Sequence, residues 1–250
     1  MSILKDKVAL VTGGGSGIGK QVALKYAAEG AKVVVSDIVE KAGNETVAEI
    51  TAAGGEAFFV KADTGSPQEN EFLVEQTLAK YGALHIACNN AGIGGPSAPA
   101  GEYELEAWDK VIKINLSGVF YGMRYQLPAI LKSGGGNIVN MASILGKVGF
   151  AGSSAYVAAK HGVVGLTEAA AIEYATKGVR VNAVGPGFIK TPLVEASMDQ
   201  ASRDALIGLH PVGRLGESAE VAELVVWLSS DKASFVTGSY YNVDGGYLAR

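Results

Sequence analysis

The stretch K-V-A-L-V-T-G-G-G-S-G-I-G, residues 7–19, is the part of the chain that decides the expected fold. Its first six residues form a short apolar run, which predicts a buried strand of a parallel sheet. Glycines follow at once, and residues 16–29 then have apolar side chains at helical spacing up to Gly30. We therefore expect a strand, a glycine-rich turn and a helix as the first unit of an α/β fold.

The alternation of strand and helix patterns continues to the end of the chain. Further strands are expected at residues 32–37, 56–61, 84–89, 137–141, 179–184 and 240–243. Helices are expected at residues 39–53, 67–81, 105–131, 153–176 and 217–229, with a capping box at Ser66-Pro67-Gln68-Glu69 and with Pro128 kinking or shortening its helix. Residues 185–216, which contain three prolines, are expected to be irregular, and 186–214 to act as a substrate lid. The pattern predicts one domain, residues 1–250, with a doubly wound parallel sheet of about seven strands and helices on both faces.

Composition excludes several other classes of protein. Of the 250 residues, 48% are apolar and 18% are charged, as in an ordinary globular protein. The formal net charge is -4 and there is no basic run, which argues against a nucleic-acid partner. No stretch approaches the ~20 apolar residues of a membrane span. A single cysteine, Cys88, and the absence of a signal-peptide pattern favour a cytoplasmic location, and the histidines lack metal-ligand spacing.

The glycine-rich turn is a candidate phosphate site. Backbone N–H groups at a helix N-terminus attract phosphate, and glycines let a pyrophosphate approach the main chain. The same glycines could serve only a tight turn. The candidate residues of this turn are Gly13, Gly15, Ser16, Gly17, Ile18 and Gly19.

Asp37 ends the second strand, 18 residues after Gly19. Its carboxylate could accept hydrogen bonds from both hydroxyls of an adenosine ribose and would repel a 2′-phosphate. No Arg or Lys stands at Ser16 or Ile38 to neutralise such a phosphate. These residues favour NAD (NADH) over NADP, although an acid in this place could also be a helix N-cap.

Polar residues also follow the next two strands. Asp63 and Thr64 end the third strand and could meet the adenine. Asn90, Ala91 and Gly92 end the fourth and could line the ribose side of a cofactor, or Asn90 could be a turn residue. Ligands of such folds bind at the carboxyl ends of the strands, where all these motifs are expected.

Tyr156 and Lys160 are a candidate proton-transfer pair. They stand at i and i+4, so on a helix their side chains share one face. A cation beside a phenol favours the phenolate and lowers a tyrosine pKa that is otherwise near ~10. Such a tyrosine can act as a general acid or base. Trp108 and Trp227, in contrast, lie on apolar helix faces and are expected in the core, as is Cys88.

Taken together, these motifs resemble the short-chain dehydrogenase/reductase family over essentially the whole chain. The matching elements are T-G-x-x-x-G-I-G at residues 12–19, N-N-A-G at 89–92, Asn115, Ser143, Y-x-x-x-K at 156–160, Pro186 and Gly187 with Thr191, and V-D-G-G at 243–246. The resemblance implies a Rossmann-like fold and a catalytic tetrad of Asn115, Ser143, Tyr156 and Lys160. In that family pattern Tyr156 transfers the proton, Lys160 lowers its pKa and holds the nicotinamide ribose, Ser143 binds the substrate oxygen, and Asn115 holds a water.

The resemblance also implies where cofactor and substrate lie. Pro186, Gly187, Ile189 and Thr191 would contact the cofactor. Substrate would be enclosed by the segments 93–99, 144–150 and 189–209, and the pocket residues are Ile93, Pro96, Ser143, Leu145, Phe150, Tyr156 and Leu193. Because most of these side chains are apolar, they favour an apolar or aryl ketone, or the matching secondary alcohol, over a polyol.

The leading hypothesis is an NAD(H)-dependent carbonyl reductase or secondary-alcohol dehydrogenase. The alternatives are a 3-oxoacyl-[acyl-carrier-protein] reductase, which could use Lys147 and Lys190 to dock an acidic carrier, a glucose-type sugar dehydrogenase, and a cofactor-binding sensor without catalysis. The helices at 105–131 and 153–176 are apolar on nearly every side, so each needs a partner beyond the sheet. Since family members commonly form homotetramers through such helices, we expect a homotetramer.

Overall fold

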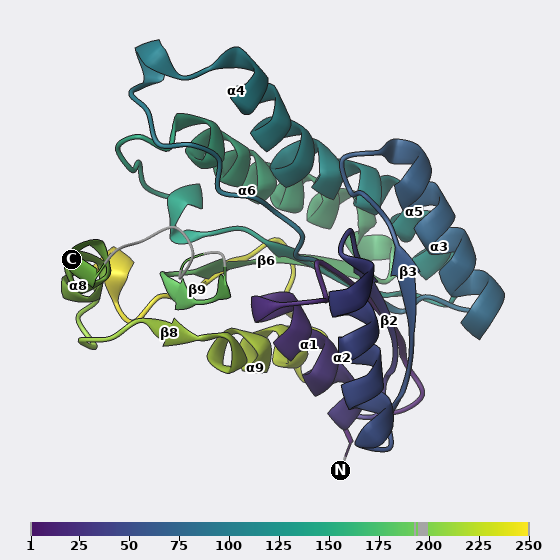
Figure 1. The fold of residues 1–250 in the computed structure, drawn as a ribbon. Helices are drawn as coiled ribbons and strands as arrows, with labels where there is room; N and C mark the ends of the chain where they lie inside the picture. Colours follow the sequence, from purple (N-terminus) through teal and green to yellow (C-terminus); the bar gives the residue numbers. More distant parts are fainter. Residues whose placement is uncertain (1, 193, 195–199, 250) are drawn as a thin grey trace.

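A seven-stranded parallel sheet forms the centre of the molecule (Figure 1). The computed structural model describes residues 2–192, 194 and 200–249. The strand order is β3-β2-β1-β4-β5-β6-β9, and every neighbouring pair is parallel. The strands are β1 (Val8–Thr12), β2 (Lys32–Asp37), β3 (Glu56–Lys61), β4 (Ile86–Asn89), β5 (Gly136–Met141), β6 (Val179–Pro186) and β9 (Tyr240–Val243). The predicted doubly wound α/β fold is confirmed.

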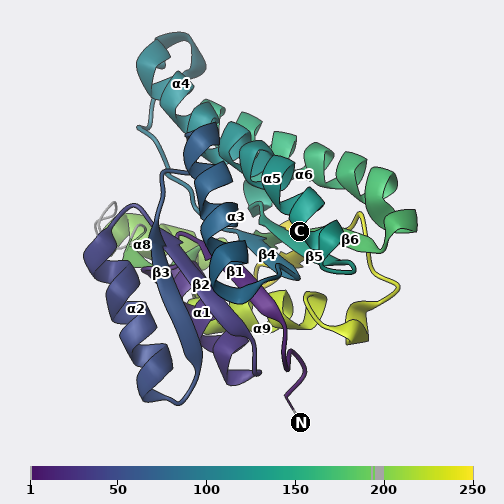
Figure 2. The same ribbon diagram turned by 90° about the vertical axis from the view of Figure 1, so that its right-hand side faces the viewer.

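Helices cover both faces of this sheet. Figures 1 and 2 show α3, α4, α5 and α6 on one side and α1, α2 and α9 on the other. The helices are α1 (Gly17–Ala28), α2 (Glu40–Ala52), α3 (Pro67–Tyr81), α4 (Leu105–Ile112), α5 (Gly118–Lys132), α6 (Ser154–Tyr174), α8 (Gln200–Gly208) and α9 (Ser218–Leu228). The predicted capping box of α3 is present only in part. The Ser66 hydroxyl accepts a hydrogen bond from the Glu69 N–H and Pro67 opens the helix, but the Glu69 carboxylate accepts from the Asp63 N–H instead of the Ser66 N–H.

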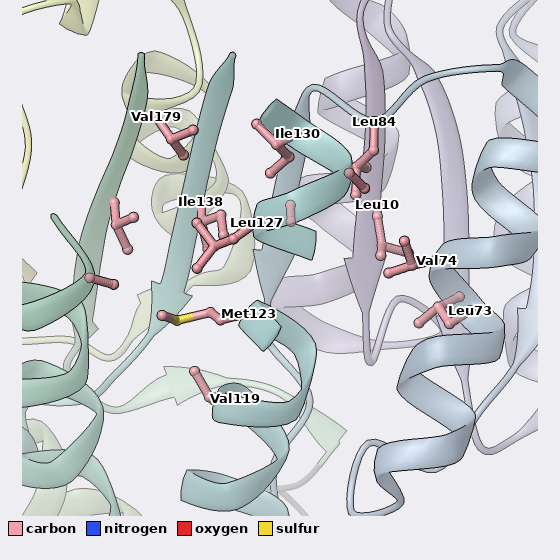
Figure 3. Packing of buried hydrophobic residues seen from close by; sticks show 14 of the residues in the cluster. Leu10, Leu73, Val74, Leu84, Val119, Met123, Leu127, Ile130, Ile138 and Val179 are labelled. Carbon is pink, nitrogen blue, oxygen red and sulfur yellow. The ribbon is translucent and has the colours of Figure 1, made fainter. Parts of the chain in front are cut away.

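Two apolar clusters, one on each face, hold the helices to the sheet. Successive strand residues point to opposite faces, so Leu10 belongs to one cluster and Val11 to the other. Figure 3 shows the first cluster, in which Met123 and Ile130 of α5 pack toward Ile138 of β5. Cys88 is fully buried in the second cluster, as expected of a small core residue. The strand ends are therefore fixed from both sides.

The predicted long middle helix is interrupted, but not at its proline. Residues Lys113–Ser117 form a π-helical segment between α4 and α5, while Pro128 lies inside α5, which continues to Lys132. A π turn accommodates one extra residue and is common at functional sites. Here it contains Asn115, whose side chain bonds to the loop after β4 rather than staying on the helix surface.

The described part of the segment expected to be irregular, residues 185–192, 194 and 200–216, contains regular elements. It contains β7 (Ile189–Lys190), which pairs with β8 (Gly216–Glu217), and the helix α8. Pro192 and Pro211 stand outside α8 and so do not interrupt it.

The prediction that the two tryptophans lie in the core is wrong, because Trp108 is 36% exposed and Trp227 is 37% exposed.

Several large apolar side chains remain exposed on the helices of one sheet face. Leu105 on α4 and Ile172 on α6 are each 81% exposed, and Phe120 on α5 is 49% exposed. In the part of the chain that the structure describes, no helix has the length and apolar character needed to span a membrane. An apolar helix face that the chain itself leaves open is a candidate surface for a second copy.

We expect the protein to be larger than a monomer in solution, and the double variant Phe120→Glu, Ile172→Glu to be smaller, because two carboxylates would have to be buried at the contact. Light scattering coupled to size exclusion measures both masses. Lys41→Glu, on the exposed face of α2, adds negative charge elsewhere and should leave the mass unchanged. A wild-type mass equal to one chain would contradict the expectation.

Candidate functional site

A cavity of about 510 Å³ opens at the carboxyl ends of the central strands. This volume lies within the usual range of ligand sites. It brings together residues that are far apart in the sequence. The predicted site residues that line it are Gly13, Ser16, Gly17, Ile18, Asp37, Ile38, Asp63, Thr64, Asn90, Ala91, Gly92, Ile93, Ser143, Tyr156, Lys160, Pro186, Gly187, Ile189 and Thr191.

The cavity lies where the order of the strands reverses. From β1 the chain proceeds to β2 and β3 on one side, and β4 begins the other half of the sheet, so the loops after β1 and β4 diverge. Hydrogen bonds join the two loop origins. The Thr12 hydroxyl accepts from the N–H of Asn90 at 3.1 Å, and the Asn90 side-chain amide donates to the carbonyl oxygen of Thr12 at 3.0 Å. Asn90 is thus a fixed part of the site.

The glycine-rich turn has a concave surface, and side chains at its glycine positions would fill the space. A Cβ at Gly13 would lie 3.0 Å from the Ala91 Cα, and one at Gly17 would lie 3.2 Å from the Thr191 side chain. Gly19 does not line the cavity, but a Cβ there would overlap the Gly13 carbonyl oxygen, so it allows α1 to pack on the turn. The first turn of α1 has no acidic residue and no side-chain cap, so its N–H groups fit a phosphate.

Asp37 is held at the end of β2 by two backbone donors. Its carboxylate accepts hydrogen bonds from the N–H of Gly15 and the N–H of Val39, both at 2.9 Å. The N-cap of α2 is Val39, so the alternative prediction that Asp37 caps this helix is wrong. Gly15 itself stays outside the cavity wall and serves to orient the acid. The site therefore has a phosphate cradle beside a fixed carboxylate, which fits a dinucleotide.

Some predicted pocket residues lie elsewhere. Leu145 is buried without lining the cavity, Pro96 is exposed, and Phe150 packs on Phe188 with ring centroids 5.7 Å apart. Leu193 lies outside the described residues. Sequence reasoning missed other residues of the wall, namely Ala62, Lys110, Ile114, Met141 and Ala142, whereas the lining residues Pro192 and Val194 fall within the predicted segment 189–209. Several of these adjoin predicted residues, and that adjacency is the signal that could have found them.

Ser143, Tyr156 and Lys160 meet at the same cavity from two elements. Ser143 follows β5, while Tyr156 and Lys160 are one turn apart on α6. The Ser143 side chain lies close enough to Tyr156 to lower the pKa of its phenol. The Lys160 ammonium lies 5.4 Å from the centre of the Tyr156 ring and donates to the Met141 carbonyl oxygen at 2.7 Å. The hydroxyl of Ser143, the phenol of Tyr156 and the ammonium of Lys160 therefore line the same part of the cavity.

Asn115 joins this group indirectly. It is fully buried, its Oδ1 accepts from the N–H of Ile93 at 3.0 Å, and its Nδ2 donates to the Ile93 carbonyl oxygen at 2.8 Å. The side chain therefore fixes the loop that walls the cavity. A water of the predicted kind would have to share an oxygen that already bonds Ile93.

The pKa values correct one expectation. Burial raises the pKa of Tyr156, and the nearby Ser143 side chain only partly lowers it. Burial also lowers the pKa of Lys160 to about 8, because a charged amine is poorly solvated there. We predicted that Lys160 lowers the pKa of Tyr156, but the net shift of that pKa is upward. The Ser143 side chain is the feature that counters desolvation of the phenol.

The chain is similar to known proteins over most of its length. A family model described as enoyl-(acyl carrier protein) reductase matches residues 13–248. The chain is 54% identical over 245 residues to a cyclohexanol dehydrogenase of Acinetobacter sp. (strain SE19), covering 98% of this chain and 96% of that protein. It is 44% identical over 252 residues to a 2,5-dichloro-2,5-cyclohexadiene-1,4-diol dehydrogenase of Sphingobium indicum, covering 100% of both chains. The crystal structure of a levodione reductase superposes with a TM-score of 0.96 at 39% identity, covering 98% of this chain and 99% of that one.

A reaction in which Tyr156 removes a proton should speed up as the pH rises toward the alkaline range, since its raised pKa keeps the phenol protonated at neutral pH. The reverse reaction, in which Tyr156 donates the proton, should slow over the same range. Ser143→Ala should move the alkaline limb to higher pH, because it removes the hydroxyl that lowers this pKa. Profiles of kcat/KM against pH in both directions test this, and a limb that stays in place or moves to lower pH would contradict it.

Proposed function

The chain belongs to the short-chain dehydrogenase/reductase family, and from this membership we propose that it interconverts alicyclic secondary alcohols and ketones with NAD as hydride carrier. The chain is an oxidoreductase of the dehydrogenase/reductase type. The proposal depends above all on one observation. Ser143, Tyr156 and Lys160 lie at a cavity whose remaining walls fit a dinucleotide.

The cavity wall around this group supports a compact apolar substrate. The loop after β4 contributes Ile93, and the segment after β6 contributes Ile189, Pro192 and Val194. Such side chains suit a carbocyclic ring and offer few fixed partners to a polyol. The names of the two relatives given above denote alcohols on six-membered carbon rings, which is the ring size we propose for this chain as well.

Each side chain then has one task in the oxidation of the alcohol. Tyr156 removes the hydroxyl proton, and the Ser143 hydroxyl donates a hydrogen bond to the substrate oxygen as it becomes a carbonyl. Lys160 is mostly protonated near neutral pH and stabilises the tyrosinate that forms. When bound, NAD accepts the hydride. In the reduction of a ketone, Tyr156 returns the proton to the substrate oxygen.

Asp37 supports NAD as the preferred cofactor. Its carboxylate is already aimed by the Gly15 and Val39 N–H groups and lines the cavity beside Ile38. A ribose with two free hydroxyls could donate to it, whereas a 2′-phosphate would be repelled. Among the described residues that line the cavity, the cations are Lys110 and Lys160, and neither adjoins Asp37 in sequence.

The carrier-protein reductase alternative receives less support. It requires a free basic patch at the entrance, to which Lys147 and Lys190 were candidate contributors. Lys190 forms an ion pair with Glu217 at 2.5 Å, and the Lys147 ammonium lies over the Tyr240 ring at 5.2 Å from its centre. The sensor alternative requires no proton-transfer group, whereas Tyr156 and Lys160 are both present at the cavity.

The wild type should oxidise cyclohexanol with NAD⁺ and reduce cyclohexanone with NADH, with a higher kcat/KM than for glucose or an open-chain alcohol. Tyr156→Phe should lose nearly all turnover and still bind NADH, because only the proton donor is removed. Absorbance at 340 nm follows turnover, and NADH fluorescence follows binding. A variant that keeps near-wild-type turnover would refute the mechanism, and inactivity on every cyclic alcohol and ketone would refute the substrate class.

Asp37→Asn should raise the KM for NAD⁺ by roughly 10- to 100-fold, as expected for loss of hydrogen bonds to a charged group. The preference for NAD⁺ over NADP⁺ should fall because the repulsion of a 2′-phosphate is also removed. Glu40→Gln is the matched control, since it removes an exposed carboxylate three residues away that does not line the cavity. Steady-state kinetics with both cofactors measure the ratio. A strong wild-type preference for NADP⁺ would overturn this assignment.

A further inference from the structure

Tyr240, the first residue of β9, reaches the backbone of the candidate catalytic serine. β9 is the edge strand next to β6, and β6 separates it from β5, which Ser143 follows. The Tyr240 hydroxyl nevertheless donates a hydrogen bond of 2.8 Å to the Ser143 carbonyl oxygen, although the two residues are 97 positions apart. The side chain thus crosses β6 to make this contact.

A glycine in β6 makes that crossing possible. A Cβ at Gly185 would overlap the hydroxyl and the adjoining ring carbon of Tyr240. Gly185 pairs with Asn242 and lies in a regular part of the sheet, so no turn requires a glycine here. On another side, the Lys147 ammonium lies 5.2 Å from the centre of the ring. Burial keeps the pKa of Tyr240 well above its usual value, so the hydroxyl remains a donor.

Ser143 is held by several hydrogen bonds besides the one from Tyr240, and its hydroxyl accepts from the N–H of Leu145 at 3.2 Å. The Ser143 carbonyl oxygen also accepts the N–H of Gly146 at 2.8 Å, and a Cβ at Gly146 would lie 2.9 Å from the Lys160 carbonyl oxygen. Just upstream, the Lys160 ammonium binds the carbonyl oxygen of Met141. Ser143 thus connects β5 to α6, and its peptide can turn only if these hydrogen bonds are lost. Rotation of this peptide would move the hydroxyl relative to Tyr156.

We propose that Tyr240 is a positioning residue that orients Ser143 for catalysis and that Gly185 provides the space it needs. This proposal rests on the proposed function only in taking Ser143 to bind the reacting oxygen. Tyr240 itself does not line the cavity. Its loss should therefore affect the chemical step and leave cofactor binding in place.

Tyr240→Phe removes the donor oxygen and keeps the ring. The kcat should fall roughly 3- to 10-fold, as for the loss of one hydrogen bond, with the KM for NAD⁺ and the NADH affinity unchanged. Tyr241→Phe is the matched control, because it removes the same atom from the next residue of β9, which packs on the opposite face of the sheet. The control should keep wild-type kcat. Equal losses in both variants, or a loss confined to cofactor KM, would overturn the proposal.

A double-mutant cycle separates positioning from general stability. In a Ser143→Ala background Tyr240→Phe should cost no further activity, because there is no hydroxyl left to orient. The cycle is measured on kcat and on the inhibition constant of the ketone product, so that slow turnover of the serine variant does not prevent comparison. Additive losses would overturn the role of Tyr240 while leaving the proposed function standing. A wild type without activity on any alcohol or ketone would overturn both.

The glycine gives a second, independent variant. Gly185→Ala should lower kcat at least as much as Tyr240→Phe, since its methyl group displaces the hydroxyl from Ser143. In a Tyr240→Val background the same substitution should cost nothing more, because the space is then free. If Gly185→Ala keeps wild-type kcat, or lowers it equally in both backgrounds, the spatial part of the proposal is wrong.

Discussion

The hydrogen bonds between the ends of β1 and β4 are the constraint on which the site depends. The hydroxyl of Thr12 accepts from two successive N–H groups, those of Asn90 and Ala91, and the Asn90 amide returns to the carbonyls of Thr12 and Gly13. These strands belong to different halves of the sheet, and their following loops must diverge. By joining the loops at their origin, the bonds place the glycine-rich turn and the Asn90 loop side by side in the wall of one cavity.

The two ends of that cavity are built by different physical means. At the Asp37 end, backbone N–H groups and glycines without side chains determine the shape of the cavity. This end therefore depends on glycines and on one carboxylate. At the Tyr156 end, buried side chains determine the shape of the cavity. Because little water reaches them, their polar atoms need hydrogen-bond partners within the protein. The displaced pKa values of Tyr156 and Lys160 arise at this second end. Under the proposed function, the first end would take the charged cofactor and the second end the apolar ring.

Sequence reasoning reached the parts of the molecule that are governed by local patterns. Buried strands are apolar runs, Gly82 ends α3 in the left-handed region, and Tyr156 and Lys160 share a helix face, so each can be found within a short window. Features that depend on distant residues were missed. The exposure of Trp108 depends on what covers α4, and the pKa of Tyr156 depends on burial that no spacing reveals.

The π-helical segment at Lys113–Ser117 has a consequence for the faces of the helices beside it. One residue advances an α-helix by about 100°, so the additional residue in this turn rotates α5 relative to the face that α4 would otherwise continue. The chain uses this offset to seat Asn115 against Ile93 and still aim Met123 and Ile130 at the sheet. The middle helix is therefore two helices in different angular phase. The number of residues in this segment therefore matters for the candidate site as much as the identity of Asn115, because it determines which way each of the two helices faces.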